Sequence, residues 1–180
     1  ERFIENDMHG SWRQRTEVSG KFQDRIWLRS YSDDTPPSLP IPARPLSIFL
    51  ESAAGWMPKR TATVFYNQKL TYQQLIEKVN QFAHVLHGKG VRPGDRVFIV
   101  LPNMPQIVIA FFAVVKIGGV AVMPNPDADG AAIMRQVKQT KPKVMITLKV
   151  FSQMAQIVNM ATELEQFIFA EIQSVVSAGV

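Results

Sequence analysis

The spacing of apolar residues predicts alternating strands and helices between residues 96 and 147. Three short apolar runs, rich in β-branched residues, are typical of buried strands. The segments between them have helical length, and the first is apolar on almost every face except at Lys116, so we expect it to be largely buried. The expected strands are 96–101, 120–123 and 143–147, and the expected helices are 107–117 and 131–140. Strands and helices alternating at this spacing predict parallel strands joined by right-handed crossovers.

The flanking segments predict further elements around this unit. A helix over residues 46–57 places apolar side chains at spacings of three, four and seven, and Pro58 ends it. Two short strands, 62–66 and 70–72, are separated by three polar residues and predict a hairpin. Residues 166–171 predict a fourth parallel strand. In the expected helix over residues 46–57, the apolar face consists of Leu46, Phe49, Leu50, Ala53 and Ala54.

Several residues are suited to mark helix ends. Thr71 and Gln74 form a capping box at the start of a helix that Gly88 and Gly90 close. Asn103 is expected to cap the helix that contains Pro105 in its first turn, and Ser152 to cap a helix before the fourth strand.

The chain is expected to be an α/β protein. We predict a mainly parallel, doubly wound sheet with helices on both faces, a small β-hairpin and an N-terminal arm. Residues 33–45 are dense in proline, which favours an extended connector. The expected division is residues 1–45 for the arm and connector and 46–180 for the α/β part. The arm is expected to lay its aromatic side chains on the main body: Trp12, Phe22, Trp27 and Tyr31.

Composition excludes some classes of site. The 180 residues contain no cysteine, which excludes disulfides and thiolate zinc sites and fits a reducing compartment such as the cytoplasm. The net charge is +5, with basic residues scattered along the chain. This pattern indicates either an ordinary solvated surface or a face for acidic ligands such as nucleotides. The long apolar run at 107–123 contains Lys116 and two glycines and is too short to span a membrane comfortably.

The residue patterns alone reveal no catalytic centre. Gly88-Lys89-Gly90 follows a helix and precedes a strand, the reverse of a phosphate-binding turn. His84 and His87 lie one helical turn apart without a third metal ligand at matching spacing. Two acidic pairs lie in turn-prone loops, and three uses remain open for them: turn formation, general acid–base work or magnesium binding. These pairs are Asp33 with Asp34 and Asp127 with Asp129. Four lysines are expected to cluster around one helix end and strand as solvated charges: Lys138, Lys141, Lys143 and Lys149.

Five motifs in order resemble the adenylate-forming superfamily, which includes acyl-CoA synthetases, nonribosomal adenylation domains and beetle luciferases. Residues 70–75 (LTYQQL) are similar to its first core motif, and 116–126 (KIGGVAVMPNP) to its second. Residues 90–97 (GVRPGDRV) and the strand at 143–147 follow at the expected spacing. Residues 101–106 (LPNMPQ) with 110–113 (AFFA) resemble the branch of long-chain fatty-acyl-CoA ligases.

The resemblance implies ATP-dependent activation of a carboxylate, assisted by Mg²⁺. The carboxylate attacks the α-phosphate to give an acyl-adenylate and pyrophosphate, and coenzyme A then takes the acyl group. The family's phosphate loop, adenine-binding motifs and C-terminal lid are expected beyond Val180, so the resemblance assigns no catalytic, cofactor-binding or metal-binding residue here. We expect this chain to be an inactive fragment that self-associates and binds no nucleic acid. Peripheral contact with a membrane stays open. The alternatives are an aryl-CoA ligase, an amino-acid adenylation domain and a non-enzymatic binding module.

Overall fold

The computed structural model describes residues 26–36, 38–39, 44–125, 128–164 and 166–171. Two compact units make up the chain, residues 1–43 and 44–180. In the first unit, a 3-10 helix, η2, spans Ile26–Ser30, and the hydroxyls of Ser32 and Thr35 lie 2.7 Å apart in a hydrogen bond. Trp12 and Phe22 lie outside the described residues. The docking of the arm on the main body stays a prediction.

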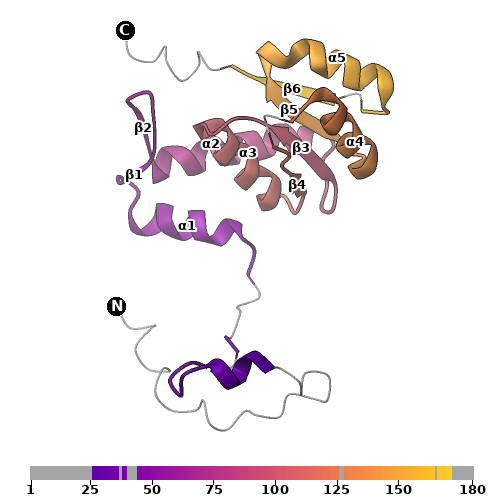
Figure 1. Cartoon of the computed structure of the whole chain (residues 1–180). Coiled ribbons are helices and arrows are strands. Elements are labelled where there is room, and N and C mark those ends of the chain that lie inside the picture. The colour runs from indigo at the N-terminus through magenta and orange to yellow at the C-terminus, as the bar shows by residue number, and fades with distance from the viewer. Residues whose placement is uncertain (1–25, 37, 40–43, 126–127, 165, 172–180) are drawn as a thin grey trace. The chain divides into compact units, whose positions relative to one another are not determined.

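The second unit contains the α/β fold (Figure 1). Its helices are α1 (Ser47–Trp56), α2 (Tyr72–Gly88), α3 (Pro105–Lys116), α4 (Gly130–Thr140), the 3-10 helix η3 (Lys149–Phe151) and α5 (Ser152–Ala161). Its strands are β1 (Thr61–Phe65), β2 (Gln68–Thr71), β3 (Arg96–Val100), β4 (Val120–Val122), β5 (Val144–Leu148) and β6 (Gln166–Ala170).

Four of these strands form the predicted parallel sheet, in the order β4-β3-β5-β6. Val97 of β3 pairs in register with Ala121 of β4 and with Val144 of β5. On the outer side of β5, Ile146 pairs with Ile168 of β6. All three pairings are parallel, which confirms the expected α/β class and the fourth strand.

Helices cover both faces of the sheet, as the alternation of side chains along a strand requires. Val97 and Ile99 of β3 point into a core shared with α1, α2 and α3. Phe98 and Val100 point the other way, into a smaller core with Ile133 and Val137 of α4 and Val158 of α5. Both Phe98 and Ile99 are buried almost completely, so β3 is central to both layers. The doubly wound arrangement is therefore confirmed.

The capping box at α2 is formed as predicted. The hydroxyl of Thr71 accepts a hydrogen bond from the Gln74 amide at 3.2 Å, and the Gln74 side chain accepts one from the Thr71 amide at 2.9 Å. The helix ends at Gly88, and Gly90 follows with φ +80°, a left-handed conformation that glycine adopts at little cost. The predicted glycine stop is thus confirmed.

Two predicted helix caps are wrong. Met104, not Asn103, precedes the first residue of α3, with φ −146° and ψ 162°. The reason is Pro105, whose ring forces the residue before it into extended backbone. Ser152 already has helical angles, φ −57° and ψ −36°, because η3 leads directly into α5. A helical Ser152 lacks the extended backbone that an N-cap needs.

The inward face of α1 also differs from the prediction. Leu50 and Ala54 are buried as expected, but Leu46 and Phe49 are exposed and Ser47 is buried instead. The helix has apolar residues on two sides, so its periodicity alone did not identify the side that meets α2 and α3.

The predicted hairpin is antiparallel, with different bounds from those expected. Phe65 pairs with Gln68, which leaves a two-residue link. The two linking residues, Tyr66 and Asn67, have φ values of 44° and 62°. Positive φ at both central positions is typical of the tight turns whose twist matches that of a hairpin.

Candidate functional site

The topology identifies the carboxyl ends of β3 and β5 as the place for a ligand. The chain leaves β3 into α3 on one face of the sheet and leaves β5 into α5 on the other. In open α/β sheets, ligands bind in the crevice outside the carboxyl ends where the connections diverge in this way. Residues 101–103 after β3 and Lys149 after β5 border this position, which we call the switch-point edge.

An ion pair links two strands at the switch-point edge. Lys149 Nζ lies 2.8 Å from Glu171 Oε1, which joins the ends of β5 and β6. The hydrogen bond to Glu171 raises the pKa of Lys149, and the same bond lowers the pKa of Glu171. Both side chains are at least half exposed, so solvent screens this pair and its contribution to stability is small.

A hollow of about 280 Å³ adjoins the same edge, between the hairpin and the start of α3. Most of its lining is apolar, including Phe65, Met104 and Val108. Thr63 contributes a buried hydroxyl without a hydrogen-bond partner among the described residues. Such a hollow suits a small apolar group and offers no charge to an anionic ligand.

The histidines of α2 do not form a metal site. His84 and His87 are both exposed on the helix. Within the described part of the chain, no group of three or more histidine, cysteine, aspartate or glutamate side chains is placed to hold a metal ion. The backbone carbonyl of His87 instead accepts a hydrogen bond from Arg92 Nη1 at 2.9 Å.

The structure describes three of the four loop aspartates, and they lie in different surroundings. Asp129 caps α4, because its Oδ1 accepts a hydrogen bond from the Ala132 amide at 2.6 Å. Its carboxylate therefore bonds local backbone, as expected of an aspartate in such a loop. Asp127 lies outside the described residues, and Asp33 and Asp34 are exposed in the first unit.

The four lysines are exposed, as predicted, but they do not form one cluster. Lys143 precedes β5 and Lys149 follows it, so the whole strand separates them. An extended strand rises about 3.3 Å per residue, which places the two lysines at opposite ends of the sheet. Lys143 pairs with Asp95 and Lys149 with Glu171. Only Lys138 and Lys141 stay together, both exposed at the end of α4, beside a hollow of about 380 Å³ that Glu163 also lines.

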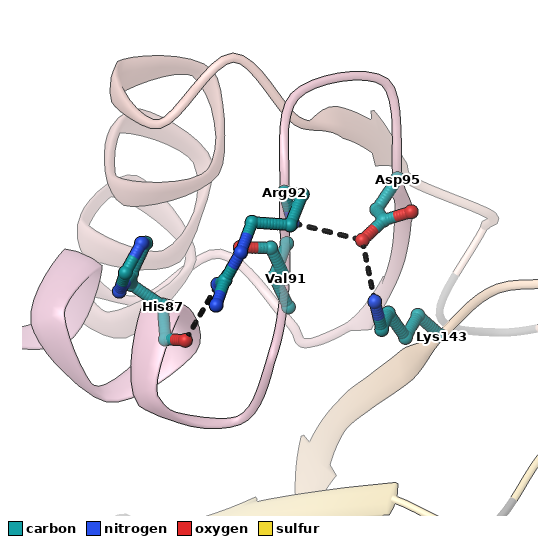
Figure 2. A network of polar contacts seen from close by, with 5 residues as sticks. All are labelled: His87, Val91, Arg92, Asp95 and Lys143. Carbon is teal, nitrogen blue, oxygen red and sulfur yellow. Dashed lines mark hydrogen bonds and ion pairs between the residues drawn. The ribbon is translucent and has the colours of Figure 1, made fainter.

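A polar network around Asp95 was not predicted from the sequence (Figure 2). Asp95 Oδ2 accepts hydrogen bonds from the Arg92 amide and from Lys143 Nζ, both at 2.8 Å. The bond from Lys143, followed by that from the Arg92 amide, holds the pKa of Asp95 below its usual range. Because the network ties the turn before β3 to the start of β5, it lies at the opposite end of the sheet from the switch-point edge.

The described residues do not fit ATP, Mg²⁺ or coenzyme A. At the switch-point edge, Glu171 is engaged by Lys149, and the nearby hollow is apolar. The pattern GxxxxGK[ST], whose backbone amides would cradle phosphates, is absent from the 180 residues. No catalytic step is therefore derived through these groups from this chain.

Comparison with known proteins identifies the family. A family model described as AMP-binding enzyme matches residues 49–177. The chain belongs to this family of adenylate-forming enzymes. The matched range covers both core motifs and all four strands of the parallel sheet. The two core motifs act here as structural features: a helix cap after β2, and a glycine turn between α3 and β4.

Two curated relatives of the AMP-binding segment differ in what they make. The chain is 36% identical over 122 residues to a long-chain-fatty-acid–CoA ligase of Bacillus subtilis, covering 68% of this chain and 22% of that protein. It is 35% identical over 124 residues to a mycosubtilin synthase of Bacillus subtilis, covering 69% of this chain and 5% of the other. The chain thus spans less than a quarter of either relative.

Solved structures share the fold. The anthranilate CoA ligase AuaEII, in complex with anthranoyl-AMP, superposes with a TM-score of 0.68 at 24% identity, covering 77% of this chain and 27% of that one. The protein VinN superposes with a TM-score of 0.64 at 25% identity, covering 74% of this chain and 33% of that one. Among the described residues, no helix combines the length and hydropathy that crossing a bilayer requires.

Proposed function

We propose that the chain is the N-terminal part of a longer ATP-dependent fatty-acyl-CoA ligase that acts in the cytoplasm. The observation that carries this proposal is the 36% identity to the fatty-acid ligase of Bacillus subtilis over 122 residues. The whole protein would join a fatty acid to coenzyme A through an acyl-adenylate, with ATP and Mg²⁺ bound by residues outside this chain.

The role of this chain in such an enzyme is architectural. It supplies the buried central strands β3 and β5, their covering helices and the switch-point edge. The Asp95–Lys143 pair links the amino ends of β3 and β5, and the turn at Gly118 links the amino ends of β3 and β4. A rigid edge of this kind positions whatever residues bind against it, which is how scaffold elements contribute to catalysis.

Specific observations support two alternative functions. An amino-acid adenylation domain is favoured by the 35% identity to the mycosubtilin synthase, which is nearly as high as that to the fatty-acid ligase. An aryl-CoA ligase is favoured by the superposition on the anthranilate CoA ligase. A non-enzymatic binding module would use the same sheet without nucleotide chemistry.

A substrate panel on the protein encoded by the whole reading frame separates these functions. ATP–pyrophosphate exchange is measured with palmitate, decanoate, benzoate and mixed amino acids, and thioester formation is followed with coenzyme A. The proposal expects exchange with the fatty acids and formation of acyl-CoA. Exchange with amino acids alone would identify an adenylation domain, exchange with benzoate alone an aryl-CoA ligase, and each would contradict the proposal. A reading frame that ends at Val180 would favour the binding module.

A further inference from the structure

The layer formed by α4, η3 and α5 has an unusual charge pattern. Between Gly130 and Thr162 the sequence contains five basic residues and no aspartate or glutamate. Two of the five, Lys143 and Lys149, are paired with acidic residues of other segments. Arg135, Lys138 and Lys141 are exposed and have no ion-pair partner among the described residues. Their charge is therefore available to an external anion.

The same layer exposes apolar side chains. Val150, Ile157 and Met160 are 74%, 60% and 86% exposed. Ala155 and Val158 of the same helix are buried against the sheet, so α5 has an apolar inner side and further apolar residues outside. None of the ten residues of α5 is charged. Its outer side can therefore enter an apolar environment without removing a charge from water.

The basic and apolar groups lie next to each other. α4 and α5 contact each other on one face of the sheet and run side by side in Figure 1. The end of α4 and the residues directly after α5 border the hollow of about 380 Å³, whose lining includes Lys138 of α4, Lys141 just after it, and Thr162 just after α5. Met160 stands two residues before Thr162. Glu163 lines the same hollow and offsets part of the positive charge.

We propose that the α4–α5 layer is a docking surface for membranes that contain anionic lipids. Exposed apolar residues beside unpaired basic residues are the combination that holds proteins at a lipid interface. Ile157 and Met160 enter the head-group region, while the long side chains of Lys138 and Lys141 reach lipid phosphates. A lipid surface fits better than an acidic protein, because α5 contains no charged residue and exposes Ile157 and Met160.

Vesicle co-sedimentation of the 180-residue chain tests this surface without any substrate, so the result is independent of the proposed ligase activity. The chain is mixed with phosphatidylcholine vesicles, with or without about 30% phosphatidylserine, at low and at high salt. Binding is expected only to the vesicles with phosphatidylserine, and it should weaken at high salt because screening shortens electrostatic attraction. Failure to bind either vesicle would overturn the proposal and leave an acidic protein as the partner to seek.

Paired variants locate the binding surface. Lys138→Gln with Lys141→Gln should lower the partition coefficient about twenty-five-fold, at roughly fivefold for each charge. Ile157→Gln with Met160→Gln should lower it roughly tenfold or more. The control, Lys78→Gln with Lys89→Gln, removes the same charge from α2 and the residue directly after it, on the other face of the sheet, and should change binding little.

The comparison between the pairs decides the outcome. Circular dichroism verifies that each variant keeps its fold, which is expected because all six side chains are exposed. An equal loss in the control pair would overturn the proposal, because net charge alone would then explain the binding. Undiminished binding by the α4–α5 variants would overturn it as well.

Discussion

The carboxylate of Asp95 joins segments 48 residues apart in the sequence through its contact with Lys143. The lowered pKa of Asp95 means that its ionised form is favoured in the folded state. A group with a lowered folded pKa stabilises the protein above its unfolded pKa, which is near 3.8, and this contribution is lost as the pH falls through the folded value.

Asp95→Asn should therefore destabilise the protein at pH 7 and much less below pH 3. Urea denaturation at both values measures the difference, and Asp33→Asn provides a control that removes the same charge from an exposed site in the first unit. A pH-independent loss in Asp95→Asn would show that its hydrogen bonds, rather than its charge, are responsible.

Thr147 is the opposite case, a buried polar group whose hydroxyl makes no hydrogen bond among the described residues. Its side chain is fully buried in β5. Thr147→Val replaces this hydroxyl by a methyl group of similar size and should stabilise the protein by about 1 kcal/mol. A loss of stability on urea unfolding would instead indicate that the hydroxyl has a buried partner such as water.

Only some of these side-chain contacts could be predicted from the sequence. The Thr71–Gln74 box was predictable because both partners lie within one helical turn. The Asp95–Lys143 pair was not, because it exists only once β3 and β5 are neighbours. For the same reason Lys143 and Lys149, close in sequence, were grouped together although a strand separates them.

At the scale of elements, the turn between α3 and β4 requires a glycine. Gly118 has φ +76°, and a Cβ placed on it would lie 3.1 Å from Cβ of Pro93. Gly118→Ala should destabilise the protein by at least about 1 kcal/mol through backbone strain and crowding.

Gly55 supplies the matched contrast in α1. Nothing lies within 4 Å of a Cβ added there, and its φ is ordinary. Gly55→Ala should stabilise the protein by about 0.5–1 kcal/mol, because alanine loses less entropy in a helix. Thermal unfolding of both variants checks the pair, and a similar effect in both would contradict the account of the turn.

The capping box gives a third element-scale prediction. Thr71→Ala removes the acceptor for the Gln74 amide and should cost about 1 kcal/mol, whereas Thr71→Ser keeps the hydroxyl and most of the stability. Chemical denaturation compares the two. Equal losses would mean that packing of the threonine methyl group, and not the cap, is what matters.

The elements themselves were predictable where hydrophobic patterns are strong, and their ends less so. β3 and β5 are buried on both faces, so their sequences are continuous apolar runs. The start of α3 depended on the effect of Pro105 on Met104, and the inward side of α1 depended on neighbours that the periodicity does not reveal.

At the scale of the whole molecule, much apolar surface is uncovered. Trp56 is 80% exposed, and Phe169 of β6, an end strand of the described sheet, is 43% exposed. Exposed apolar surface and open strand edges favour association. We therefore expect the chain to self-associate, with a mass that rises with concentration in light scattering. A constant monomer mass at high concentration would contradict this.

The candidate site was the least predictable feature at this scale, because it arises from topology. Parallel strands were expected, but the strand order, which positions the divergence of connections between β3 and β5, came from the structure.

Pyrophosphate release tests most directly the claim that this chain is the scaffold part of a carboxylate-activating enzyme. The 180-residue chain and the protein encoded by the whole reading frame are each mixed with ATP, Mg²⁺, palmitate and coenzyme A. We expect release by the longer protein and none by the chain alone. Sustained turnover by the isolated chain, or none by the longer protein, would contradict the account.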